Sequence, residues 1–279
     1  MQKRVVAIHD ISCVGKCSLT VALPILSAAG LEASVLPTAV LSTHTGGFSG
    51  FTYRDLTSDI LPIVEHWKKL NLRVDALYTG YLGSFEQIEL VSGIFDTFRR
   101  EDMLILVDPV MGDHGELYAT FTKEYSKGMA RLCAGADIIV PNLTEAALLL
   151  ERPYVSTGYD EKYIEDMLVQ LSELGPKKVV LSGVSFAKGE VGAASYDRVT
   201  GEFGYFFAEE IEGRYHGTGD IFASVLLAAV LREKTLSQAI EIAVSFTVEC
   251  IRRTKKAGTD VRFGVEFETV IPSLIQKLC

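Results

Sequence analysis

Two glycines and a carboxylate stand together late in the chain, in the segment His216-Gly217-Thr218-Gly219-Asp220. The apolar residues that follow predict a helix over residues 220–231. Glycines at alternate positions let a backbone approach a ligand closely, and the start of a helix adds the positive end of its dipole. Gly217, Thr218 and Gly219 are therefore candidates for holding a phosphate through backbone N–H groups.

Asp220 is the candidate base of this segment. An Asp in the first helical turn is also an ordinary capping residue, favourable without any chemical role. A carboxylate beside a phosphate site is electrostatically unfavourable unless it has a function, and accepting a proton from an attacking hydroxyl group is such a function. The segment thus indicates phosphoryl transfer to a hydroxyl group.

The elements that must position these residues alternate between strands and helices. Apolar runs and helical spacing predict strands at 4–8, 33–41, 76–79, 103–107, 137–140 and 178–181, and helices at 16–29, 56–70, 85–99, 123–132, near 144 and at 161–174. An antiparallel pair at 192–196 and 204–207 and three helices at 220–231, 236–254 and 265–276 complete the chain. This order predicts an α/β fold whose mostly parallel central sheet is flanked by helices on both faces, with a small edge-strand flap.

Ligands of such sheets bind beyond the carboxyl ends of the strands. Polar clusters fall at these ends, at residues 9–12 (HDIS), 79–81 (TGY), 108–110 (DPV), 142–145 (NLTE) and 182–183 (SG). No flexible linker or internal repeat divides the chain, so we expect one domain over residues 1–279.

The net charge and the cysteines indicate which binding partners and which cellular compartment to expect. The net charge of -9 argues against a nucleic-acid partner, because phosphate backbones require a basic face. The five cysteines form no Cys-x-x-Cys pair, and the apolar run at the N-terminus is too short for a membrane span or a signal peptide. We therefore expect a cytoplasmic protein that binds small molecules and no membrane. Residues 15–18 (GKCS) do not complete a P-loop, since Asp10 and Cys17 stand where a Gly and a Ser or Thr are required.

Residues 217–220 resemble the C-terminal signature of the ribokinase-like superfamily. Four further stretches resemble the pyridoxal kinases of that superfamily: residues 42–46 (STHTG), 80–84 (GYLGS), 108–112 (DPVMG) and 141–145 (PNLTE). The likeness runs in order through essentially the whole chain. It implies a kinase that uses ATP and Mg²⁺ to phosphorylate the 5′-hydroxymethyl group of pyridoxal, pyridoxine or pyridoxamine.

The resemblance also implies roles for individual residues. Asp220 would be the base, with Gly217, Thr218 and Gly219 around the migrating phosphoryl group. The nucleotide side would comprise Asp108, Asn142, Thr144, Glu145 and Ser182, with Asp108 and Glu145 near the metal ion. The ring of the substrate would be contacted by Asp10, Ser12, Thr45, Gly46 and Tyr81.

The first strand departs from the pyridoxal kinase pattern. Those kinases commonly have a Ser at the level of Asp10, whereas an Asp there looks more like the hydroxymethylpyrimidine kinases. The substrate thus stays open between a pyridine and an aminopyrimidine. A sugar kinase of the same fold would usually have a larger lid, and a non-catalytic vitamin- or nucleotide-binding protein is the rival from another class. Strands near residues 33–41 suggest a homodimer.

Overall fold

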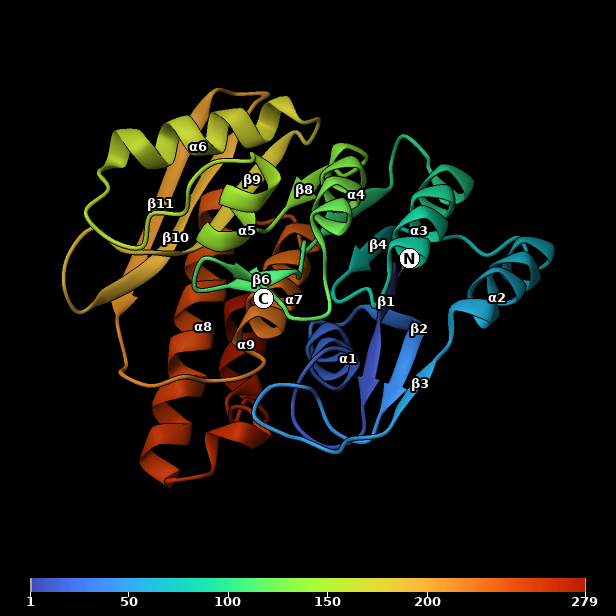
Figure 1. Ribbon diagram of the computed structural model, residues 1–279, viewed down its shortest axis with the longest axis horizontal. Helices are drawn as coiled ribbons and strands as arrows, with labels where there is room; N and C mark the ends of the chain where they lie inside the picture. Colours follow the sequence, from blue (N-terminus) through green and yellow to red (C-terminus); the bar gives the residue numbers. More distant parts are fainter. Residues whose placement is uncertain (1, 279) are drawn as a thin grey trace.

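The computed structural model describes residues 2–278, and these residues contain a nine-stranded sheet in the order β11-β10-β9-β8-β5-β4-β1-β2-β3 (Figure 1). The strands are β1 (Arg4–Ser12), β2 (Glu32–Leu41), β3 (Tyr53–Asp55), β4 (Ala76–Thr79), β5 (Leu104–Val107), β8 (Ile138–Ile139), β9 (Lys178–Val184), β10 (Glu190–Asp197) and β11 (Glu202–Glu209). The six central strands of this sheet, β9, β8, β5, β4, β1 and β2, pair in parallel. The strands β10 and β11 at one edge and β3 at the other pair antiparallel. The α/β fold class expected from the sequence is confirmed.

Helices cover both faces of the sheet because its central strands are apolar on both sides. One face packs against α1 (Leu19–Ala28), α7 (Thr218–Leu231), α8 (Leu236–Ala257) and α9 (Ile271–Leu278). The other packs against α2 (Thr57–Lys69), α3 (Phe85–Phe98), α4 (Lys123–Ala134), α5 (Leu143–Leu149) and α6 (Glu161–Glu173). No helix within residues 2–278 is long and apolar enough to cross a membrane.

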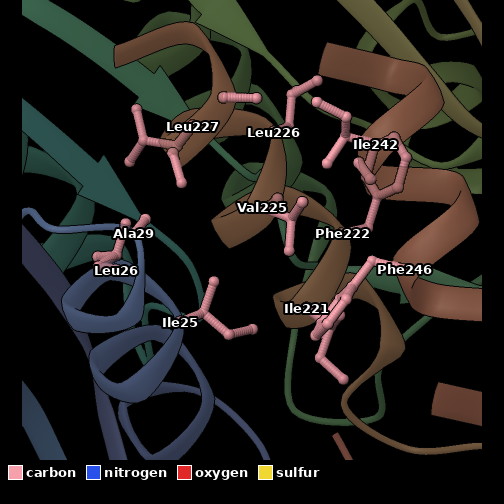
Figure 2. Close-up of a cluster of buried hydrophobic side chains, with 14 of the residues drawn as sticks. Ile25, Leu26, Ala29, Ile221, Phe222, Val225, Leu226, Leu227, Ile242 and Phe246 are labelled. Atoms are coloured by element: carbon pink, nitrogen blue, oxygen red, sulfur yellow. The ribbon is translucent and has the colours of Figure 1, made fainter. Parts of the chain in front are cut away.

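Helix α7 lies in the middle of the first layer and fixes the position of its own N-terminus. Figure 2 shows its side chains Ile221, Val225 and Leu226 between those of α1 and α8. Almost every residue from Ile221 to Leu231 is buried, which is expected for a helix that is apolar all round. The turn at residues 216–217 and the first turn of α7 are therefore carried by a rigidly packed element.

The chain order of neighbouring strands reverses at β1, which has β2 on one side and β4 on the other. Such a reversal leaves a crevice at the carboxyl ends of the two strands, where ligands of open α/β sheets bind. The register of β1 against β2 shifts between His9 and Ile11, so Asp10 lies at an irregular point of the strand beside this crevice.

Several boundaries differ from the sequence-based expectation. Strand β1 continues to Ser12, so Asp10 and Ser12 belong to the strand rather than follow it. Helix α1 begins at Leu19 because residues 13–18 form a loop, and α9 begins at Ile271, after a 3₁₀ turn over Val261–Phe263. The strand β3 and a two-stranded hairpin, β6 (Gly112–Asp113) and β7 (Glu116–Leu117), were not expected.

Candidate active site

A pocket with a volume of about 840 Å³ opens at the carboxyl ends of the strands. All the site residues expected from the sequence lie within the described part of the chain, and all but Thr144 line this pocket. The lining set is Asp10, Ser12, Thr45, Gly46, Tyr81, Asp108, Asn142, Glu145, Ser182, Gly217, Thr218, Gly219 and Asp220. Residues from seven separate segments of the chain thus meet in one cavity.

The N-terminus of α7 forms one wall of the pocket. Gly217 precedes the helix with φ 77° and ψ 1°, a left-handed conformation that glycine adopts without strain. A Cβ atom built on Gly217 would lie 1.9 Å from the carbonyl oxygen of Lys16, so the two backbones could not approach this closely with any other residue. By contrast, a Cβ built on Gly219 would meet no atom within 4 Å. The first turn of α7 therefore faces open space with its N–H groups unhindered.

Asp220 lies in this first turn. Its side chain is partly accessible from the pocket, but its carboxyl group is deep enough that desolvation raises its pKa to about 7. The backbone N–H of Ser18 opposes this rise, and the neighbouring charge of Asp10 adds to it. A carboxyl group that titrates near neutral pH is suited to accept a proton from a substrate and to release it afterwards.

Asp10 faces the pocket from β1 and is held by two hydroxyl groups. Ser18 donates to its Oδ1 atom over 2.5 Å, and Ser12 donates to its Oδ2 atom over 3.1 Å. Burial raises the pKa of Asp10, whereas the hydrogen bonds from Ser18 and Ser12 lower it. Each carboxylate oxygen retains a lone pair, so this group can accept a further hydrogen bond from a ligand.

The loop at residues 42–47 is held by His44. The Nε2 atom of His44 lies 2.6 Å from the carbonyl oxygen of Arg262, and its Nδ1 atom accepts the N–H of Gly46 over 3.1 Å. Nε2 therefore carries the proton of a neutral ring, and burial lowers the pKa of His44 accordingly. Thr45 and Gly46 are thereby kept at the rim of the pocket.

Tyr81 reaches the pocket from the turn that follows β4. Gln87 accepts the N–H of Gly83 over 2.7 Å and donates to the carbonyl of Thr38, which ties this turn to β2. The Tyr81 ring lies 5.6 Å from that of Phe121, centroid to centroid. Tyr81 thus contributes an aromatic surface to the pocket that Thr45 and Gly46 also line.

Two buried carboxyl groups, Asp108 and Glu145, also line the pocket. Burial and the charge of Glu145 raise the pKa of Asp108 well above its ordinary value, and burial raises that of Glu145 to about 8. Groups of like charge held this close become stable when a cation lies near them. Carboxylate oxygen is the donor that Mg²⁺ prefers, so the pair fits that ion.

The segment at residues 142–145 is hydrogen-bonded to the β6–β7 hairpin and to the residue before it. The side chain of Asn142 donates to the Gly112 carbonyl over 3.0 Å, and Glu145 accepts the Met111 N–H over 3.2 Å. Thr144 accepts the N–H of Gly115 at the tip of the hairpin over 2.9 Å. Thr144 therefore lies behind the pocket wall, in contact with the hairpin rather than with the cavity.

Sequence reasoning did not identify several further lining residues, among them Cys17, Ser18, His44, Tyr118, His216 and Thr247. His44 and His216 lie inside two of the recognised motifs, and their positions there could have indicated them. Ser18 belongs to residues 15–18, which do not complete a P-loop, and its residue type gives no indication of its backbone conformation. Lys16 pairs with Glu268 over 2.8 Å and does not line the pocket, in agreement with the rejection of a P-loop.

A pocket that combines a glycine-flanked helix N-terminus, a carboxyl base and paired carboxylates is suited to moving a phosphoryl group. Together with the sheet behind it, this pocket defines a small-molecule kinase of the ribokinase-like fold. The sequence matches the family described as phosphomethylpyrimidine kinase over residues 25–263, and the chain belongs to this family.

Known relatives agree with this assignment. Pyridoxal kinase PdxY of Actinobacillus pleuropneumoniae is 31% identical over 250 residues, which span 82% of this chain and 81% of the relative. The crystal structure of pyridoxal kinase from Lactobacillus plantarum has a TM-score of 0.91 at 31% identity, covering 99% of this chain and 98% of the other. A Bacteroides thetaiotaomicron protein, provisionally named a phosphomethylpyrimidine kinase and crystallised with pyridoxal, has a TM-score of 0.94 at 39% identity and coverages of 98% and 96%. The expected resemblance to the pyridoxal kinases is confirmed.

Proposed function

We propose that the protein transfers the γ-phosphoryl group of ATP to the 5′-hydroxymethyl group of pyridoxal, pyridoxine or pyridoxamine. The observation that carries this function is that Asp10 and Asp220 face the same cavity, one suited to a ring and the other to a hydroxyl group. The curated relatives named pyridoxal kinase and the related structure crystallised with pyridoxal support the same substrate class.

On the acceptor side, the substrate ring lies between Asp10, Ser12, Tyr81 and the loop that carries Thr45 and Gly46. Asp10 accepts a hydrogen bond from a ring nitrogen or an amino group of the substrate. This orientation presents the hydroxymethyl group to Asp220, which takes its proton as the oxygen attacks phosphorus. Holding the two reactants in this geometry supplies a large part of the rate enhancement.

On the donor side, the γ-phosphate lies over the first turn of α7, against the N–H groups of Gly217, Thr218 and Gly219. Asn142 and Ser182 lie along the path of the remaining phosphates, at the ends of neighbouring strands. Val244, Val248 and Ile251 of α8 also line the pocket and offer an apolar surface for the nucleobase.

The charge of the pocket supports a role for Mg²⁺. Among the described residues that line it, none is Lys or Arg, while five are carboxylates: Asp10, Asp108, Asp113, Glu145 and Asp220. ATP brings several further negative charges, so a cation must neutralise them. We assign Asp108 and Glu145 as the groups that hold Mg²⁺, directly or through water, and the bound ion would neutralise charge on the phosphates.

No group of three or more metal-binding side chains occurs within residues 2–278. This arrangement suits Mg²⁺ that arrives with ATP, since the phosphates then complete its coordination.

Thr144 supports nucleotide binding indirectly. Replacing Thr144 with Val removes the acceptor of the Gly115 N–H, a loss of about 1 kcal/mol for such a hydrogen bond. The hairpin that carries Asp113 and Tyr118 then loosens, and we expect the KM for ATP to rise about fivefold with a smaller change in the KM for pyridoxal. ATP saturation curves would measure this, with Thr144→Ser as the matched control that keeps the hydroxyl group. Equal KM values for ATP in Thr144→Val and Thr144→Ser would show that the hydrogen bond from Gly115 to Thr144 does not support nucleotide binding.

The main alternative is hydroxymethylpyrimidine kinase activity, which the presence of Asp10 and the family description both favour as a second candidate. ATP consumption should be measured with pyridoxal, pyridoxine and hydroxymethylpyrimidine offered separately in the presence of Mg²⁺. We expect turnover on the pyridines to exceed that on the pyrimidine. Turnover chiefly on the pyrimidine would establish the alternative, and none on any substrate would favour a non-catalytic binding protein or a sugar kinase.

The same substrate panel tests the role of Asp10. Asp10→Ser introduces the residue common in pyridoxal kinases and removes a negative charge. We expect it to retain kcat on the pyridines with a raised KM for them, and to lower turnover of the aminopyrimidine at least tenfold, because a carboxylate binds an amino group through a charge-assisted hydrogen bond. Loss of both activities in equal measure would show that Asp10 does not discriminate between the rings.

We further propose that residues 1–279 act as one kinase domain in the cytoplasm. The continuous sheet supports a single domain, and the free thiols of Cys13, Cys17, Cys133 and Cys250 suit a reducing compartment. A homodimer is also proposed, with the exposed edge strand β3 next to β2 as the contact surface.

A further inference from the structure

Ser18 has a backbone conformation that a serine rarely adopts. Its φ of 55° and ψ of -129° correspond to the first central position of a type II′ turn, where glycine predominates. The residue is nevertheless buried, immediately before α1, and lines the pocket. A non-glycine residue held in this way costs free energy, and such residues concentrate at functional sites.

The usual reason for a serine before a helix is absent here. A serine in this position commonly accepts an N–H of the first helical turn through its Oγ atom, but Ser18 makes no such cap. Its Oγ atom donates instead to Oδ1 of Asp10 over 2.5 Å. Neither the backbone conformation nor helix capping accounts for a serine at this position. We therefore take the hydrogen bond from its hydroxyl group to Asp10 as the reason for the serine.

Ser18 also acts on the proposed base. Its backbone N–H favours the ionised form of Asp220, against the effect of burial. The same residue therefore contacts both carboxyl groups to which the proposed mechanism assigns the acceptor substrate. Glycine at this position would keep the N–H but lose the contact with Asp10.

We propose that Ser18 is a positioning residue whose strained backbone places its hydroxyl group against the Asp10 carboxylate and so holds that carboxylate toward the substrate ring. This inference rests on the proposed function for the identity of the ring. The hydroxyl group of Ser12 holds the other oxygen of Asp10, so two serines fix the carboxylate in one plane. The lone pairs that remain on the two oxygens stay available to a ligand in the pocket that Asp10 lines.

The ionisation of Asp10 depends on every charged or titratable group around it. Asp220 lies close enough for the two carboxyl groups to affect each other, and Cys17, Tyr53 and Tyr81 also face Asp10. None of these groups is a cation, so the effect of burial on the pKa of Asp10 is opposed by hydrogen bonds alone, from the hydroxyl groups of Ser18 and Ser12 and from a backbone N–H group. Removing one donor should therefore raise the pKa of Asp10.

The first test is Ser18→Gly in the full-length protein. Glycine adopts the backbone conformation without strain, so the variant should fold with an equal or higher Tm. We expect the KM for pyridoxal to rise about tenfold with kcat and the KM for ATP nearly unchanged, since a hydrogen bond to a charged group is lost. Ser18→Ala should raise the KM for pyridoxal equally but lower the Tm. Unchanged pyridoxal kinetics in Ser18→Gly would overturn the proposal.

Two further measurements separate positioning from a merely structural role. In ligand-free protein, the ¹³C carboxyl titration of Asp10 should move to higher pH by about one unit in Ser18→Gly, and an unmoved titration would refute the proposal. This readout needs no substrate, so it stands even if the wild-type protein fails to phosphorylate pyridoxal. In an Asp10→Asn background, Ser18→Gly should have no additional effect on pyridoxal binding, whereas additive effects would show that Ser18 does not act through Asp10.

Discussion

Asp220→Asn is expected to lower turnover by about 10²- to 10⁴-fold, because the amide cannot accept the proton of the substrate hydroxyl group. Binding of ATP and of pyridoxal should persist, since Asn has nearly the same size and leaves Gly217, Thr218 and Gly219 in place. Calorimetric binding together with steady-state turnover measures both quantities. Near-normal turnover in this variant would mean that Asp220 is not the base.

The pH dependence of the wild-type protein provides a second check on Asp220. Its pKa of about 7 in the free protein predicts that kcat/KM falls as the pH drops below 7, since the protonated acid cannot act as a base. Asp113→Asn, which removes an exposed carboxylate from the rim of the same pocket, should leave this acid limb in place. An acid limb that persists near pH 7 in the residual activity of Asp220→Asn would assign it to another group.

As the pH rises, the contribution of Asp220 to the stability of the folded protein should fall while kcat/KM rises. Below about pH 4 the Asp220 carboxyl group is protonated in both the folded and the unfolded protein, so its burial does not lower the stability of the fold. Between pH 4 and 7 the folded protein holds this proton more tightly, so stability falls as the pH rises, and the full penalty remains above pH 7. Asp220→Asn is therefore expected to have a higher Tm than the wild type at pH 8 and nearly the same Tm at pH 4.

The core of the fold could be predicted because its strands are short apolar runs bounded by polar residues or glycine. Strand β4 occupies the residues predicted for it, 76–79, since Asp75 and Gly80 flank four apolar or β-forming residues. The site was largely predictable for a related reason. Ligands of a parallel sheet bind at the carboxyl ends of strands, so polar residues at those points of the sequence converge in space.

What could not be predicted depends on contacts between distant segments. Strand β1 continues through His9 and Asp10 because it still pairs with β2 there, two serine hydroxyl groups bind the Asp10 carboxylate, and the His9 ring packs edge-on against Tyr78. The β6–β7 hairpin has only two residues in each strand, too few for any periodicity, and it is held by the side chains of residues 142–145. Thr144 thus belongs to a recognisable motif, but its contact with the hairpin becomes visible only in the folded protein.

The backbone of the phosphate-binding turn should be as sensitive as the base. Gly217→Ala would bring a Cβ atom to 1.9 Å from the Lys16 carbonyl oxygen, at a left-handed φ of 77°, so the start of α7 must move. A misplacement of about 1 Å in such a site can cost about 10²-fold in rate. We therefore expect kcat to fall by at least that factor and the Tm to fall by several degrees.

Gly219→Ala is the matched control, because its Cβ atom would meet nothing within 4 Å and its φ is not left-handed. This variant should keep or slightly raise the Tm, as expected when alanine replaces glycine in a helix. Its added methyl group enters the open space over the first turn of α7, so the KM for ATP should rise if the γ-phosphate lies there. We expect the Tm to fall in Gly217→Ala alone and ATP binding to be impaired in both variants. This result would show that Gly217 allows the close approach of the backbone to Lys16 and that Gly219 leaves room for the phosphate. A Gly217→Ala protein with wild-type Tm and turnover would show that the contact with Lys16 does not determine where α7 begins.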